Sequence, residues 1–162
     1  MRFTVLCSLV FLSAASPLGA QSLDIGGIEV RIGQPIELAL SQLRVAYNLK
    51  YEDNVKRWFV SRQDGSVDVS LGQVGVADGI VNFIAKEYKI DVYRLDAVYT
   101  AAMHDTQRRG GTTCTTFPSE SENVIHSIET VCGRYRLGFT LPFTIPAMQY
   151  GGGIQLYVAA QP

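Results

Sequence analysis

Two cysteines are the residues whose type and spacing most clearly indicate chemistry. Cys114 and Cys132 lie in β-favouring segments on either side of 117–123, a polar stretch with turn residues. A hairpin centred near Asn123 places the two cysteines opposite one another, because their positions average to 123. Opposed positions of an antiparallel pair bring Cβ atoms close enough for a bridge. The spacing therefore predicts a disulfide, which stabilises the fold by on the order of 3 kcal/mol.

A nucleophilic role for Cys114, with His126 as its base, is the alternative chemistry. The same hairpin register pairs His126 with Glu120 and leaves it away from Cys114. A bridged cysteine also has no thiolate to offer. We therefore predict a structural disulfide and name no catalytic residue.

Histidines and carboxylates do not form a recognisable metal motif. The sequence has two histidines, His104 and His126, and the one carboxylate beside them is Asp105. Zinc requires three or four converging ligands, and neighbouring residues on a helix point in different directions. We predict no metal and no cofactor, and we expect His104 to lie exposed near a helix C-terminus.

Glycines and arginines suggest anion binding only weakly. The three glycines at 151–153 precede an expected strand, whereas a phosphate loop needs a helix N-terminus after its glycines. Arg108 and Arg109, with Arg134 and Arg136, could hold an anion. Such arginines more often lie exposed to solvent at a helix end or on a strand face without binding a ligand.

An apolar, proline-bearing segment is the candidate partner-binding site. Residues 141–150 carry two prolines and precede three glycines, and loops are usually polar. Such a segment either folds back over the core or binds a partner. If it binds, the contact residues are Phe143, Ile145, Met148 and Tyr150.

The first twenty residues have the pattern of a secretory signal. Arg2 is followed by a short apolar run, a proline and small residues, so cleavage after Ala20 would leave Gln21 first. A retained anchor is the alternative, although the run is shorter than the roughly 20 residues of a membrane-spanning helix. Lipidation at Cys7 is another, but small residues do not precede it. We expect an exported protein, periplasmic or extracellular, whose cysteines meet oxidising conditions.

Composition limits the classes of function. Removing residues 1–20 removes one arginine and no acid, so the formal net charge changes from −1 to −2. That balance does not attract nucleic acid or acidic membranes, and no later segment is apolar enough to span a bilayer. Residues 21–162 have the size of one domain with one core.

The first half of the mature chain reads as a strand, a helix and a three-strand meander. Pro35 and Glu37 suit a helix start, and an apolar stripe runs from Ile36 to Tyr47, with Lys50 toward the helix end. Asp78-Gly79 between apolar runs predicts a tight hairpin turn. The expected strands are 28–32, 56–62, 74–77 and 80–84.

The second half repeats this order. Asp91 can cap a helix whose stripe runs from Val92 to Met103 and which stops before Gly110. The disulfide hairpin and strands at 135–140 and 154–158 follow. We predict an α+β fold with two helices packed on an antiparallel sheet. Two helix-plus-meander units, 28–86 and 91–160, are possible within it.

The stretch from Ile32 to Ile84 resembles a known helix-plus-meander unit. It combines Gly33-Gln34-Pro35, a leucine-rich helix, the Trp58 strand and the Asp-Gly turn, over about a third of the chain. It is similar to small bacterial envelope proteins of the outer-membrane-assembly lipoprotein and β-lactamase-inhibitor-protein group. The resemblance implies protein binding through the sheet. The chain departs from the group in lacking a lipidated cysteine, and no functional residue can be transferred.

The expected function is that of an exported, non-enzymatic module that binds another envelope or extracellular protein. The alternative is a small secreted enzyme or an enzyme inhibitor. A deep pocket with a buried acid or histidine would favour the enzyme. A flat sheet face rich in Trp58 and tyrosines would favour the binding module.

Overall fold

A computed structural model describes residues 21–89, 92–120, 126–140 and 153–160. The expected signal at 1–20 lies outside the described residues. The same holds for the four candidate partner-binding residues Phe143, Ile145, Met148 and Tyr150.

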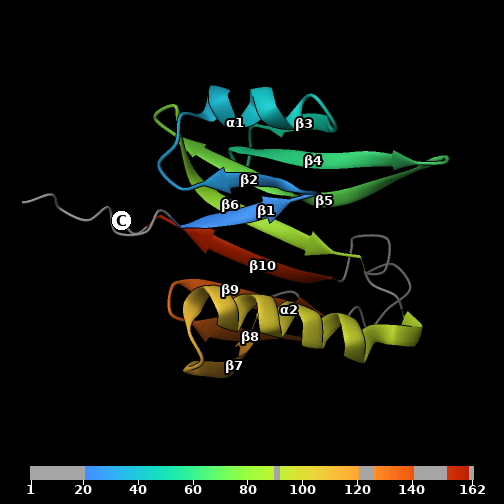
Figure 1. Ribbon diagram of the computed structural model, residues 1–162, viewed down its shortest axis with the longest axis vertical. Coiled ribbons are helices and arrows are strands. Elements are labelled where there is room, and N and C mark those ends of the chain that lie inside the picture. Colours follow the sequence, from blue (N-terminus) through green and yellow to red (C-terminus); the bar gives the residue numbers. More distant parts are fainter. Residues whose placement is uncertain (1–20, 90–91, 121–125, 141–152, 161–162) are drawn as a thin grey trace, which may run out of the picture.

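Two helices and ten strands make up the described fold, so the chain has the mixed α and β composition expected (Figure 1). A short hairpin comes first, with β1 at Ser22–Ile25 and β2 at Ile28–Arg31. The helices are α1, Ile36–Leu43, and α2, Leu95–Gly110, which a 3-10 turn at Val92–Arg94 precedes. The other strands are β3 Asn48–Glu52, β4 Arg57–Asp64, β5 Val67–Ala77, β6 Ile80–Tyr88, β7 Cys114–Glu120, β8 His126–Cys132, β9 Tyr135–Thr140 and β10 Ile154–Ala159.

Strands β3 to β10 form one eight-stranded sheet in the order β3-β4-β5-β6-β10-β9-β8-β7. Every pairing in it is antiparallel. A helix followed by four strands occurs twice along the chain, and each set runs from an edge of the sheet to its centre. The two sets join where β10 pairs with β6, so the last strand lies in the middle of the sheet.

One face of the sheet carries α1, the β1–β2 hairpin and α2 (Figure 1). Side chains of all three pack with the sheet in a single apolar cluster. Along β10, Ile154, Leu156 and Val158 are buried on this covered face. Gln155 and Tyr157 alternate with them and so belong to the opposite face.

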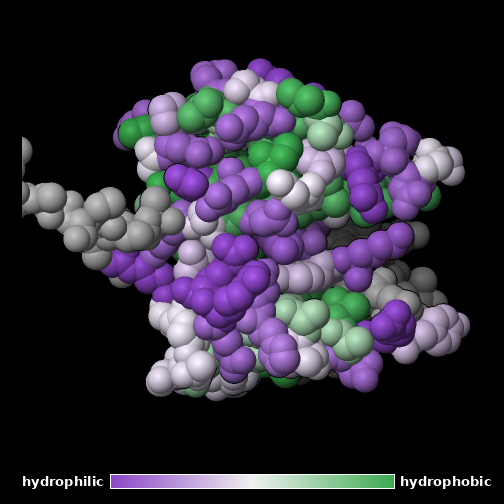
Figure 2. Space-filling view, viewed as in Figure 1, coloured by the Kyte–Doolittle hydropathy of each residue, from purple (hydrophilic) through white to green (hydrophobic). Residues whose placement is uncertain are grey.

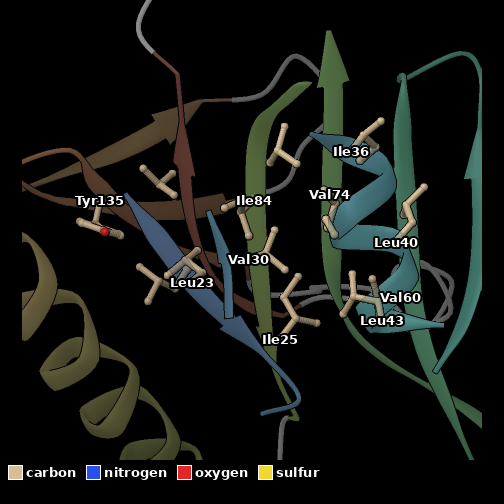
Figure 3. Packing of buried hydrophobic residues seen from close by; sticks show 14 of the residues in the cluster. Leu23, Ile25, Val30, Ile36, Leu40, Leu43, Val60, Val74, Ile84 and Tyr135 are labelled. Atoms are coloured by element: carbon tan, nitrogen blue, oxygen red, sulfur yellow. The ribbon is translucent and has the colours of Figure 1, made fainter. Parts of the chain in front are cut away.

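The core lies between the hairpin, α1 and the sheet (Figure 3). Leu23 and Ile25 from β1 belong to the same cluster as Val60 and Val74 of the sheet, and each of these four is fully buried. Full burial of one such side chain contributes about 1.5–3 kcal/mol. Without its helices and hairpin, the sheet would expose these apolar residues to water.

The prediction for the first helix is wrong at its C-terminal end. Helix α1 ends at Leu43, and residues 48–52 form β3 instead of a last turn. Leu49 and Tyr51 pair with Val60 and Trp58 of β4, so long-range pairing overrides the helical stripe. The meander therefore has four strands, not three.

The first strand was missed, although its sequence carries a signal. Leu23 and Ile25 alternate with polar residues, and a Gly26-Gly27 turn with positive φ at both glycines joins β1 to β2. A pair of glycines between alternating segments is typical of a hairpin. The sheet content of the protein is correspondingly higher than predicted.

Two further boundaries differ in the second half. A 3-10 turn at Val92–Arg94 occupies the helix start predicted at Val92, and the α-helix α2 follows from Leu95; Asp91 lies outside the described residues. The disulfide hairpin is longer than predicted, because β7 continues through Phe117 and Pro118 to Glu120. A proline is tolerated there because β7 is an edge strand, where its missing N–H breaks no ladder.

Predictions from local turn chemistry are confirmed. Asp78 and Gly79 have φ of 52° and 75°, as a type I′ turn requires. Cys114 lies opposite Cys132 in the β7–β8 register, and their sulfur atoms are bonded. Glu120 lies opposite His126 as expected. Neither described helix is both long and apolar enough to cross a membrane.

Candidate functional site

The face of the sheet opposite the helices is the candidate functional site, and we call it the outer face. No described helix or strand lies over it, since α1, α2 and the hairpin pack on the other side. Strand alternation determines which side chains it presents. Its central members are Arg57, Phe59, Gln73, Phe83, Glu87, Glu129, Arg136, Gly138, Gln155 and Tyr157.

One half of the outer face is organised around an arginine. The Arg57 guanidinium lies 3.9 Å from the centre of the Phe83 ring and donates to Gln73 Oε1 at 3.0 Å. Gln73 Nε2 in turn donates to Glu87 Oε1 at 3.3 Å. Burial lowers the pKa of Arg57 from its usual value, although the guanidinium stays charged at any physiological pH. These contacts hold a cation over an aromatic ring.

The other half is organised around Glu129, whose residue is 9% exposed. Tyr157 donates its hydroxyl to Glu129 Oε1, and Arg136 donates to the same oxygen at 3.2 Å. Burial, and then the bond to Glu129, raise the pKa of Tyr157 to about 12. Tyr157 therefore remains a hydrogen-bond donor at neutral pH. Its ring lies 5.9 Å from that of Phe83, which connects the two halves.

A small hollow opens between Glu129 and Gln155. In the register, Gly138 lies opposite both of these residues and contributes no side chain between them. The resulting pocket has a volume of about 180 Å³, and Tyr157, Thr140 and Ser127 also line it. The pocket is polar and lies over the neighbouring strands β8, β9 and β10.

No family model, curated protein or solved structure matches the chain. The outer face must therefore be interpreted from its own chemistry. It combines side-chain amides with two arginines and several aromatic rings, and arginines and aromatic residues are enriched in protein-binding surfaces.

A second polar cluster lies on the covered face, where Asp105 of α2 meets β6. The Asp105 carboxylate is 10% exposed and accepts from Arg108 at 2.6 Å, Tyr88 at 2.9 Å and Arg109 at 3.1 Å. Lys86 lies 3.4 Å from it and bridges to Asp24 of β1. Figure 2 shows polar residues gathered where α2 lies beside the hairpin. All four groups donate to this one carboxylate. Because Lys86 and Tyr88 belong to β6, their bonds to Asp105 hold α2 against the sheet.

In the part of the chain that the structure describes, the residues singled out in the sequence are not brought together into one site. The disulfide lies at the β7 edge, and His104 is exposed on α2 as expected. Arg108 and Arg109 are held by Asp105, and Arg136 is held by Glu129. These pairs disfavour the anion site that the arginines suggested.

Trp58, whose presence on an open sheet face would favour the binding module, lies on the covered side. It contacts Tyr51, with ring centres 5.0 Å apart, and the Arg44 guanidinium lies 5.6 Å from its ring. Within the described ranges, no three His, Cys, Asp or Glu side chains converge where they could hold a metal ion.

Sequence reasoning missed Arg57, Glu129 and Tyr157 as members of one surface. Alternation along β10 does separate Gln155 and Tyr157 from its apolar residues. That signal shows that the strand has two different faces. It does not show that six strands distant in sequence place their polar sides together.

Proposed function

We propose that the chain is an exported protein-binding module whose contact surface is the outer face of its sheet. The observation that carries the proposal is the connected set of ring, guanidinium and amide contacts from Arg57 to Glu129. Such contacts hold the side chains in place before a partner arrives, so little conformational entropy is lost on binding.

The composition of the face supports a protein partner. Tyrosine and arginine dominate the energy of protein interfaces, and a rim of polar groups excludes water around them. The resemblance of residues 32–84 to envelope proteins that bind through a sheet points to the same surface. The Phe143 to Tyr150 segment remains a second candidate contact, outside the described residues.

Export fits the folded domain. The expected cut after Ala20 would leave Gln21 first, and Gln21 already belongs to the fold because Ile32 N donates to its carbonyl oxygen at 2.8 Å. The Cys114–Cys132 bond is compatible with an oxidising compartment.

An affinity capture with matched variants tests the binding role. Mature protein, residues 21–162, would be used to capture proteins from the envelope and extracellular fractions of its host. The test variant, Arg57→Glu with Glu87→Lys, changes two charges on the outer face. We expect this variant to capture at least tenfold less of the partner than the wild type captures.

The control variant, Glu37→Lys with Arg44→Glu, makes the same charge changes at exposed positions of helix α1 and its end. It should capture the same partner as the wild type. Retention of the partner by the outer-face variant, or its loss from the control alone, would show that another surface binds. Circular dichroism would confirm that both variants are folded.

Neither Asp105 nor Glu129 has the surroundings of a catalytic acid, so these two residues do not support the enzyme hypothesis. The buried acid Asp105 is saturated by four donors and faces the core side. Glu129 lies at a pocket of about 180 Å³, which is small beside the 300–1,000 Å³ of typical ligand sites.

A further inference from the structure

The pocket over Gly138 exists because a side chain is missing, not because the backbone demands glycine. Gly138 is absent from the described residues with positive φ. A Cβ added there would lie 3.7 Å from Tyr157 Cε1 and 3.8 Å from Gln155 O, which is ordinary van der Waals contact. By comparison, a Cβ on Gly75 of β5 would lie 2.8 Å from Phe83 Cβ. An alanine would therefore fit at 138, and its absence leaves the hollow open.

Hydrogen-bond acceptors border this hollow. Within the described residues, the side-chain donors Tyr157 and Arg136 both meet Oε1 of Glu129. Gln155 directs its amide nitrogen to Glu87 Oε1 at 3.4 Å, so its carbonyl oxygen points away from Glu87. A carboxylate this close to burial gains free energy from each charged donor that it meets.

The chain itself shows which group fits such surroundings. Arg57 places its guanidinium over the ring of Phe83 and donates to the amide oxygen of Gln73. The pocket offers the same two partners, the Tyr157 ring and the Gln155 amide, and adds a carboxylate. Guanidinium and ammonium groups bind both carboxylates and aromatic faces.

We infer that the Gly138 pocket receives a lysine or arginine side chain of the protein partner, with Glu129 as its counter-ion and Tyr157 as its aromatic wall. This inference rests on the proposed function, because it names the anchor of the same outer face. An anionic side chain would meet the Glu129 charge, and an apolar one would offer that carboxylate no donor.

Arg136 is the internal competitor for Glu129. Its side chain is 51% exposed and reaches the carboxylate through one nitrogen at 3.2 Å. Because the half-exposed guanidinium reaches Glu129 through a single bond, an incoming cation can compete with it for the nearly buried carboxylate. Removal of Arg136 should therefore tighten cation binding, an effect that a purely structural Glu129 would not produce.

Titration of the mature protein with small probes tests this assignment by amide chemical shifts. The probes are Nα-acetyl-arginine amide, Nα-acetyl-lysine amide and the neutral Nα-acetyl-citrulline amide. We expect saturable shifts at Glu129, Gly138 and Gln155 with one or both cationic probes. Citrulline should bind at least tenfold more weakly, and the two cationic probes distinguish arginine from lysine.

Four variants identify the pocket as the binding site. Glu129→Gln should weaken binding of the cationic probe at least tenfold, and Gly138→Val should abolish it by filling the hollow. Arg136→Gln should tighten binding about threefold, and the exposed α1 variant Glu37→Gln should change nothing. Because valine is larger than the alanine that fits, Gly138→Ala serves as the milder variant and should weaken binding with no loss of thermal stability.

The outcomes separate this inference from the proposed function. Absence of saturable shifts, equal binding of citrulline, or unchanged affinity in Gly138→Val would overturn the pocket assignment. The pocket assignment would also be wrong if the Arg57 and Glu87 variant loses the partner but Gly138→Val keeps it. In that case the outer face would still be the binding surface. Specific cation binding without any captured partner would instead contradict the protein-binding role.

Discussion

At the scale of single residues, Asp105 shows how a charge is accommodated near the core. Its carboxylate faces Lys86, Tyr88, Arg108 and Arg109, and it is 10% exposed. Burial by itself would raise the pKa of Asp105. The bonds from Arg108 and Tyr88, with the charges of Arg109 and Lys86, outweigh burial and lower the pKa from 3.8 to about 2.

A lowered pKa makes folding stability depend on pH in a defined direction. The stabilisation from Asp105 is complete above pH 4, because the carboxyl is ionised in both the folded and unfolded chain. It is lost as the pH falls from about 4 through 2, where the folded protein must also take up the proton. The difference amounts to about 2 kcal/mol.

We therefore predict that Asp105→Asn lowers the free energy of unfolding by about 2–3 kcal/mol at pH 7, since it also removes the acid that Arg109 pairs with and one of the two that Lys86 meets. Urea unfolding between pH 2 and 7 measures this. The variant should show a flatter pH dependence than the wild type. Asp53→Asn, at a side chain that is 82% exposed, is the control and should change stability by less than about 1 kcal/mol. A wild-type pH profile retained in Asp105→Asn would contradict the assignment.

At the scale of elements, the disulfide fastens an edge strand. Cys114 of β7 is bonded to Cys132 of β8, which is fully buried, across 18 residues of sequence. Strand β7 has a neighbour on one side only and carries Pro118. The disulfide at the first residue of β7 keeps this strand from separating from the sheet.

Replacement of both cysteines by alanine should lower the free energy of unfolding by about 2–4 kcal/mol and keep the fold, because the backbone ladder of β7 and β8 remains. Chemical unfolding and circular dichroism measure the two effects. A reducing agent should weaken the wild type by a similar amount and leave the double variant unchanged. Two reactive thiols in folded, exported protein would disprove the bond.

At the scale of the whole molecule, β10 makes the two halves interdependent. It is the last strand in sequence, yet it lies between β6 and β9. The hydrophobic cluster likewise continues from α1 through the hairpin to Ala102 of α2. The two halves therefore share one continuous sheet and one hydrophobic cluster.

We expect the mature protein to unfold in one cooperative transition. In calorimetry, the measured enthalpy of unfolding should equal the van't Hoff enthalpy. Deletion of residues 153–162 should abolish that transition, because it exposes the edges of two central strands. Two separate transitions in the intact chain would show instead that residues 28–86 and 91–160 fold independently.

Export is a prediction for the molecule in its host. Protein recovered from the envelope or medium should begin at or near Gln21, as N-terminal sequencing would show. The amino acid before the cut, Ala20, is small, as signal peptidases require. Intact Met1 in cytoplasmic protein would contradict export and remove the oxidising environment from the disulfide argument.

Local physics explains what the sequence alone predicted correctly. The Asp78-Gly79 turn, the opposition of Cys114 and Cys132, and the start of α1 after Pro35 each depend on residues close in the chain. The helix boundary at Leu43 was missed because the stripe beyond it suits a helix, whereas pairing with β4 favours a strand.

Tertiary structure decided the place of β10 and the identity of the candidate site. Alternation along each strand determined that Gln155 and Tyr157 share a face, as do Glu129 and Val131. It could not determine which face the helices and hairpin would cover. That choice depends on where distant apolar surfaces are buried together, which is a property of the whole fold. Glu129, Gly138 and Gln155 therefore become neighbours only when β8, β9 and β10 pair.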